Sequence, residues 1–126
     1  SSVLGILAQR LVRRVCPKCK EFYTPEPALS KELGVTDRMT KNVQFARGKG
    51  CGLCGQSGYK GRIGIYELLK LTPEIQSLVL KRASAANIRE VAVSQGLTTL
   101  RQAALEKLFS GMTSVEEVFR VTLDSG

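Results

Sequence analysis

CPKC at residues 16–19 is matched later in the chain by CGLC at residues 51–54, and these two stretches decide how the intervening segment folds. Each is a Cys-x-x-Cys pair, and a tight turn with this spacing directs two sulfur atoms toward one point. Pro17 restricts the backbone of the first turn, whereas Gly52 and Gly55 give the second turn its conformational freedom. We therefore predict that the two turns meet around one metal ion.

Zinc is the metal that four cysteines favour. The chain contains only these four cysteines, and Zn²⁺ prefers thiolate ligands at the corners of a tetrahedron. A complete shell of protein ligands leaves no open position for water or substrate, so the predicted ion is structural. The predicted ligands are Cys16, Cys19, Cys51 and Cys54.

Two other uses of the cysteines remain open. Disulfides require an oxidising compartment, but residues 3–15 are interrupted by Gln9 and several arginines and do not resemble a secretory signal. A thioredoxin-like redox centre would use one Cys-x-x-Cys pair and leave the other unexplained.

The formal net charge of +8 is unevenly distributed along the 126 residues. The first 62 residues contain 12 basic and 4 acidic side chains, whereas the rest of the chain contains 7 of each. Four thiolates around one zinc ion carry a net negative charge. We therefore expect part of the basicity, that of Lys18, Lys20, Lys49 and Lys60 beside the cysteines, to stabilise the thiolate cluster internally.

No run of about eighteen apolar residues is present, which is the minimum for a membrane-spanning helix. Because no secretory signal is recognisable either, the sequence predicts a soluble, cytoplasmic location.

The pattern of apolar residues predicts an α+β fold, with a tetracysteine zinc-binding subdomain followed by a small strand-plus-helical C-terminal subdomain. Residues 3–15 carry apolar residues at helical spacing, with arginines on the opposite side, and predict an amphipathic helix. A short helix through Leu29 and Leu33 is expected to end at Gly34, and residues 43–47 alternate as a short strand.

Beyond Tyr59 the pattern predicts one strand over residues 62–71, in which Glu67 is the only polar interruption of the apolar face, and then four short helices. Each helix begins at a residue suited to its first turn. The predicted starts are the Thr72-Pro73 pair, Ser84, Thr98 and Thr113, and the last forms a capping box with Glu116.

The sequence lacks the residues of a recognisable active site. It contains no histidine, the commonest general base. The Gly48-Lys49 dipeptide does not belong to a phosphate-binding loop, because Val43 replaces the first glycine of that motif and Gly50 replaces its hydroxyl residue. Glu116 and Glu117 are interpreted as favourable charges at a helix N-terminus. We expect no catalysis by this chain alone.

Three stretches carry a family resemblance: LAQRLVRRVCPKC at residues 7–19, GCGLC at 50–54 continuing as GYKGRIGIYEL at 58–68, and GMTSVEEVFRVT at 111–122. Together they resemble the C-terminal region of the ATPases of type II secretion and type IV pilus assembly. The joined tetracysteine element and terminal motif make the resemblance specific.

The resemblance implies a fragment of a hexameric, magnesium-dependent ATPase at the inner face of the inner membrane, with ATP and Mg²⁺ bound only by the full-length parent. It assigns residues 1–15 to a helix from the end of the ATPase core, 16–60 to the zinc-binding subdomain and 61–126 to the C-terminal subdomain. The implied partners are other subunits of the homo-hexamer and inner-membrane platform or assembly proteins, without nucleic acid. The implied role is subunit contact and force transmission.

Arg10, Arg13 and Arg14 have two interpretations. The simpler one is a solvated face of the predicted first helix. The functional one, which follows from the resemblance, is a subunit contact or an edge of the nucleotide pocket.

Two competing functions remain. A basic zinc ribbon with Phe22, Tyr23, Phe45 and Tyr59 could bind phosphates and stack on bases. The chain could also be an interaction adaptor that never belonged to a motor.

Overall fold

The computed structural model describes residues 4–40 and 42–122. Its mixed content of helices and two small sheets confirms the predicted α+β class. None of the helices in the described ranges is long and apolar enough to cross a membrane. In chain order the elements are β1 (Gly5–Val15), β2 (Lys20–Tyr23), α1 (Pro27–Leu33), α2 (Asp37–Thr40), β3 (Phe45–Gly48), β4 (Tyr59–Lys70), α3 (Pro73–Leu80), α4 (Ala85–Ser94), α5 (Leu100–Phe109) and α6 (Val115–Thr122).

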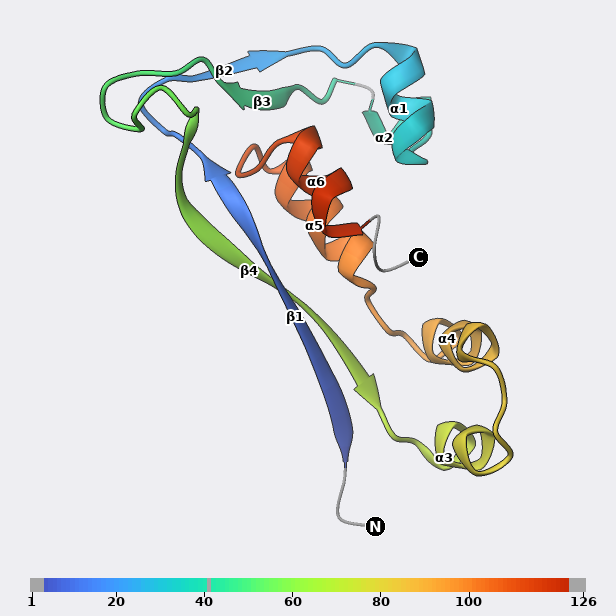
Figure 1. The fold of residues 1–126 in the computed structure, drawn as a ribbon. Coiled ribbons are helices and arrows are strands. Elements are labelled where there is room, and N and C mark those ends of the chain that lie inside the picture. The colour runs from blue at the N-terminus through green and yellow to red at the C-terminus, as the bar shows by residue number, and fades with distance from the viewer. Residues whose placement is uncertain (1–3, 41, 123–126) are drawn as a thin grey trace.

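The longest element of the fold is a twisted two-stranded ribbon of β1 and β4 (Figure 1). The strands pair antiparallel from Gly5 opposite Lys70 to Val15 opposite Tyr59, with a register shift between Arg13 and Val15. A second antiparallel ribbon, of β2 and β3, lies beyond one end of the β1–β4 ribbon (Figure 1). Helices α3 and α4 lie near the other end of the β1–β4 ribbon. The cysteine turns therefore occupy the junction between the two ribbons.

The prediction of a helix over residues 3–15 is wrong: Val3 lies outside the described residues, and residues 5–15 form β1. Apolar residues occur on both faces of this strand, so their spacing also fits a helix. Pairing with β4 decides the conformation, because it satisfies the backbone groups of alternate residues along the length of β1. Since successive side chains of a strand alternate, Arg10 and Arg13 lie on opposite faces of the ribbon.

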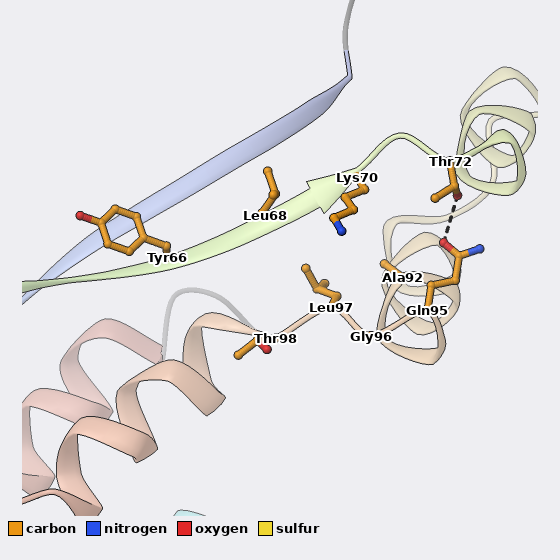
Figure 2. Close-up of a pocket in the computed structure, with 9 residues that line it drawn as sticks. All are labelled: Tyr66, Leu68, Lys70, Thr72, Ala92, Gln95, Gly96, Leu97 and Thr98. Atoms are coloured by element: carbon orange, nitrogen blue, oxygen red, sulfur yellow. Dashed lines mark hydrogen bonds between the residues drawn. The ribbon is translucent and has the colours of Figure 1, made fainter.

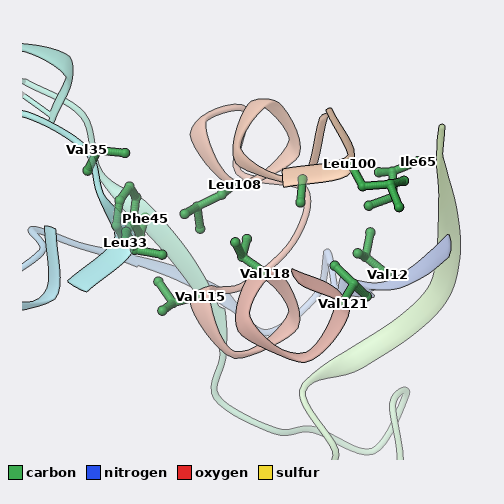
Figure 3. Close-up of a cluster of buried hydrophobic side chains, with 11 residues drawn as sticks. Val12, Leu33, Val35, Phe45, Ile65, Leu100, Leu108, Val115, Val118 and Val121 are labelled. Carbon is green, nitrogen blue, oxygen red and sulfur yellow. The ribbon is translucent and has the colours of Figure 1, made fainter. Parts of the chain in front are cut away.

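The buried core joins three parts of the chain (Figure 3). The ribbon contributes Val12 and Ile65, and the segment between the cysteine pairs contributes Leu33, Val35 and Phe45. Helices α5 and α6 contribute Leu100, Ala104, Leu108, Val115, Val118 and Val121. The segment between the cysteine pairs, residues 20–50, is consequently packed on the last two helices and shares their core.

Local signals located most helix ends. Thr72 and Ser84 cap α3 and α4 as predicted, and Gly34 ends α1 with φ of 77° in the left-handed region. Two starts differ by one residue. Thr99, not Thr98, caps α5 in a capping box with Gln102.

The start of α6 also differs from the prediction. Ser114 Oγ accepts a hydrogen bond from the Glu117 backbone N–H, at 3.3 Å, and so occupies the capping position predicted for Thr113. The Thr113 hydroxyl instead donates to the Arg13 carbonyl oxygen, at 2.7 Å. Thr113, the predicted cap, therefore links α6 to β1 through a tertiary hydrogen bond.

Glu117 is a buried anchor between α6 and β1, and its interpretation as a helix-dipole residue was incomplete. Its carboxylate accepts hydrogen bonds from the Arg13 backbone N–H at 2.6 Å, Arg13 Nη2 at 3.1 Å, Arg120 Nε at 2.9 Å and Arg120 Nη2 at 2.8 Å. Burial alone would raise the pKa of Glu117, but the hydrogen bonds from Arg120 and Arg13 lower it to about 2.

Glu67 has a similar role on β4. Its carboxylate pairs with the Arg89 guanidinium at 2.9 Å and 3.3 Å, and it accepts a 2.8 Å hydrogen bond from the Leu100 backbone N–H. The only polar interruption of the predicted strand therefore holds α4 and the start of α5 against the ribbon.

We expect Glu117→Gln to lower the free energy of unfolding by about 2 kcal/mol at neutral pH, because the neutral amide pairs poorly with two guanidinium groups. The folded-state pKa of about 2 lies below the ordinary 4.5, so the carboxylate stabilises the fold above pH 4.5. This stabilisation is lost as the pH falls toward 2, and the difference between variant and parent should shrink over that range. Denaturant unfolding at several pH values measures it. Glu116→Gln, at an exposed neighbour, is the control, and a pH-independent difference would contradict this role of Glu117.

Leu108→Ala should lower the free energy of unfolding by about 3 kcal/mol, because the side chain is fully buried and leaves a cavity in the shared core. Leu80→Ala is a matched control, since Leu80 also lies on a helix but is 84% exposed. Equal effects in denaturant unfolding would show that the shared core contributes little.

Candidate metal centre

The two cysteine turns bring four thiols together at the junction of the ribbons. All four are free, and their sulfur atoms lie within 4.8 Å of one another. The Sγ–Sγ distances are 3.8 Å for Cys16–Cys51, 3.8 Å for Cys19–Cys54 and 3.7 Å for Cys51–Cys54. The predicted convergence of the two turns is confirmed.

These distances fit a tetrahedral metal site. With a metal–sulfur bond of about 2.3 Å, sulfur atoms at the corners of a tetrahedron lie about 3.8 Å apart. A disulfide would require about 2.05 Å. The quartet is therefore positioned to bind a metal ion, consistent with zinc, and its geometry is not that of a disulfide pair.

Backbone amides surround the sulfur atoms. Gly50 N–H donates to Cys19 Sγ at 3.2 Å, while Cys51 N–H and Gly58 N–H donate to Cys54 Sγ at 3.3 Å and 3.2 Å. Such donors stabilise thiolates and orient them toward a metal. The turns thus provide both the ligands and much of their hydrogen-bonded support.

The role of the lysines as counter-charges to a zinc–thiolate centre stays a prediction. Within residues 4–40 and 42–122, the amines of Lys18, Lys49 and Lys60 form no hydrogen bond or ion pair with the sulfur atoms, and the Lys20 amine lies 6.0 Å from the centre of the Phe22 ring. Backbone N–H groups supply the sulfur contacts instead. The positive charge of the lysines consequently remains available at the surface.

The surroundings of the thiols give Cys19 and Cys54 different pKa values. Burial alone would raise the pKa of Cys54, but hydrogen bonds from the Cys51 and Gly58 amides lower it to about 6. Burial raises the pKa of Cys19 to about 11. A metal must therefore displace protons from part of the quartet, so metal affinity is expected to fall as the pH is lowered.

Two glycines allow the turns to approach, and their role was not recognised from the sequence. A Cβ atom on Gly48 would lie 2.0 Å from the Gly58 carbonyl oxygen, and Gly58 has φ of +82°. The Gly58 carbonyl oxygen also accepts a hydrogen bond from Cys16 N–H at 2.9 Å. A side chain at Gly48 would push this backbone away from the first turn.

Away from the cysteines, a groove separates β4 from α4 and the loop after it (Figure 2). Lys70 is the only charged side chain among its lining residues, and the Thr72 hydroxyl donates to Gln95 Oε1 at 3.0 Å. This lining offers no acid–base pair. The clearest candidate for site chemistry in the described residues remains the sulfur quartet.

Most of the aromatic residues considered for base stacking have internal partners. Tyr23 packs edge-on against Phe45, with ring centres 6.1 Å apart, and Phe45 is fully buried. The Arg13 guanidinium lies 4.0 Å above the Tyr59 ring. Phe22 is the exception, at 55% exposed.

Arg10, Arg13 and Arg14 of β1 have different environments. Arg13 binds Glu117, so the interpretation of a solvated helix face is wrong for this residue. Arg14 Nε donates to the Lys60 carbonyl oxygen at 3.1 Å, and Arg10 is exposed.

The sulfur quartet lies at the junction of two ribbons, and the segment between the cysteine pairs packs on the two C-terminal helices. This arrangement defines a candidate metal-binding module attached to a helical region. Residues 1–120 match the family described as "Type II/IV secretion system protein". The chain belongs to this family, which confirms the resemblance drawn from its motifs.

Individual relatives agree with this assignment. The chain is 40% identical to a type IV pilus assembly ATPase PilB of Thermus thermophilus, covering 98% of the chain and 14% of the relative. It is 43% identical to a type II secretion system protein E of Pseudomonas aeruginosa, covering 97% and 24%, and 38% identical to a type II secretion system ATPase E of Vibrio cholerae, covering 99% and 24%. The chain thus spans about a quarter or less of their lengths. These names describe secretion and pilus proteins and give no support to the nucleic-acid alternative.

The reduced protein should bind one zinc ion per chain, measured by elemental analysis after removal of loosely bound metal. Cys54→Ser should lose this ion because it removes one of four ligands, and Gly48→Ala should weaken binding because it separates the turns. Leu53→Ala is the matched control, since Leu53 lies within the second turn, is 49% exposed and is not a ligand. A metal-free protein that keeps its fold in the presence of a chelator would contradict a structural metal.

Proposed function

We propose that this chain is the metal-binding and helical C-terminal portion of a hexameric ATPase that powers pseudopilus or pilus assembly and protein export. The family match over residues 1–120, with the sulfur quartet inside it, is the observation that carries the proposal. Zinc is the cofactor of this portion. ATP and Mg²⁺ are bound by the remainder of the longer protein, which works in the cytoplasm at the inner face of the inner membrane.

An exposed apolar face of the long ribbon supports the attachment of this chain to a larger core. Leu7, Leu11, Tyr66 and Leu68 lie on the same face by strand register, and they are 62%, 41%, 51% and 47% exposed. A cluster of large apolar side chains on a two-stranded ribbon is unfavourable in water and is typical of a covered surface. In the proposed arrangement residues 1–15 end the ATPase core, as a strand where a helix was predicted, 16–60 form the zinc-binding subdomain and 61–126 the C-terminal subdomain.

The proposed role of this portion is to contact neighbouring subunits and inner-membrane platform or assembly proteins, and to transmit force to them. A structural zinc ion contributes on the order of ten kcal/mol to the folding of a small domain, so a subdomain held in this way resists deformation. Its attachment to the rest of the chain is also firm. Val15 N–H donates to the Met112 carbonyl oxygen at 2.9 Å, next to the point where β1 enters the first cysteine turn.

Cys51→Ser in the full-length parent should abolish secretion or piliation while nucleotide binding survives, because the substitution disrupts the zinc-binding subdomain and leaves the nucleotide site intact. Secretion or pilus assays measure the first effect, and titration of the purified protein with a nucleotide analogue measures the second. Leu53→Ala is the control for a change at the same turn. Loss of nucleotide binding in Cys51→Ser would contradict a force-transmitting role. The absence of a G-x-x-x-x-G-K-[ST] loop upstream in the parent sequence would contradict the motor itself.

A further inference from the structure

Six basic residues lie within or beside the cysteine turns or, for Arg62, opposite Arg13 at the adjoining end of β4, and we call them the basic cluster. Lys18 lies between the first two cysteines, and Lys49 N–H donates to the Cys19 carbonyl oxygen at 3.1 Å. Lys20 lies on β2 at the same end of the second ribbon, opposite Gly48. The members of the basic cluster are Arg14, Lys18, Lys20, Lys49, Lys60 and Arg62, and all but the half-buried Lys20 are exposed.

The charge of this cluster is not neutralised by carboxylates. In the described part of the chain the ion pairs involve other arginines, namely Arg47 with Glu21, Arg89 with Glu67, and Arg13 and Arg120 with Glu117. Because backbone amides hold the sulfur atoms, six positive charges remain around a centre whose zinc form would carry only about two negative charges. The surface therefore keeps a positive potential after metal binding.

A groove suited to a polypeptide adjoins the cluster. It is lined by Phe22, Thr24, Asn42, Val43 and Gln44, along the ribbon of β2 and β3. Phe22 is 55% exposed, and the Lys20 amine lies 6.0 Å from its ring centre, so the groove and the cluster are continuous. Since β2 and β3 are paired only with each other among the described strands, the ribbon also has unpaired backbone groups along its edges.

We propose that the basic cluster and this groove bind an extended, acidic segment of a partner protein, with an apolar side chain of that segment packed against Phe22. Carboxylates of the segment pair with the lysines, while the amide and hydroxyl groups of the groove and the open strand edge hydrogen-bond to its backbone. This inference rests on the partner-contact role proposed above, and it specifies that the contacting segment of the partner is acidic and extended.

The alternatives of a membrane or a nucleic acid fit the surface less well. A membrane surface would leave the hydrogen-bonding groups of the groove without specific partners. Single-stranded nucleic acid is held by several exposed aromatic rings, and at this end of the molecule Phe22 is the exposed aromatic, whereas Tyr23, Phe45 and Tyr59 have internal contacts.

The test uses the zinc-loaded chain and a fluorescently labelled, glutamate-rich peptide with one central phenylalanine. We expect saturable binding that weakens as ionic strength rises, and no binding of the same peptide with glutamine in place of glutamate. Lys18→Glu/Lys49→Glu should weaken binding at least about tenfold because it reverses two charges of the cluster. Phe22→Ala should weaken binding severalfold without changing its dependence on salt.

Lys81→Glu/Arg82→Glu is the matched control, because it makes the same charge change at exposed residues after α3. Zinc content and circular dichroism establish that each variant is folded, and Lys49→Glu/Lys60→Glu replaces the first double variant if Lys18→Glu impairs metal binding. Equal losses in the control would overturn the assignment to this surface. Tighter binding of phosphatidylglycerol vesicles or short DNA, lost in the same variant, would overturn the assignment to an acidic protein segment. Either result with zinc still bound concerns the partner alone and leaves the proposed motor function untouched.

Discussion

The arrangement of this protein depends on the convergence of four sulfur atoms from two turns that are 31 residues apart in the sequence. The chain between the turns is short, and its described residues, 20–40 and 42–50, form two short helices and a two-stranded ribbon. Such a segment buries little apolar surface by itself. Closing it at the cysteines, and packing Leu33 and Phe45 against the last helices, gives it a defined position.

A second constraint acts where β1 enters the first turn. The carboxylate of Glu117 joins the backbone and guanidinium of Arg13 to α6, and Arg120 extends the contact to the Leu11 carbonyl oxygen at 2.7 Å. Tyr59 packs against Arg13, and its hydroxyl lies 2.5 Å from Ser114 Oγ. The candidate metal centre and the last helix are therefore linked through the same end of the long ribbon.

The two ends of the ribbon differ in how tightly they are held. Near the cysteines, the ribbon, the metal-binding segment, α5 and α6 share one core. At the other end, α3 and α4 pack mainly on each other and are joined by the hydrogen bond between Thr72 and Gln95. The pair is tied to the ribbon through the contact of Glu67 with Arg89 of α4. In the proposed motor, this division places the shared core next to the metal site and leaves a separately attached helix pair.

Local chemistry in the sequence predicted the convergence of the four cysteines and determined most of the helix ends. Cys-x-x-Cys turns, the caps at Thr72 and Ser84 and the left-handed Gly34 depend on interactions within a few residues, so they are recognisable without the fold. Only the tertiary structure decided that residues 5–15 form a strand, because their hydrogen-bonding partner begins more than 40 residues later. It also decided that Glu117 is a buried acceptor, since its Arg13 donors lie 104 residues away and no local pattern reports such a distance.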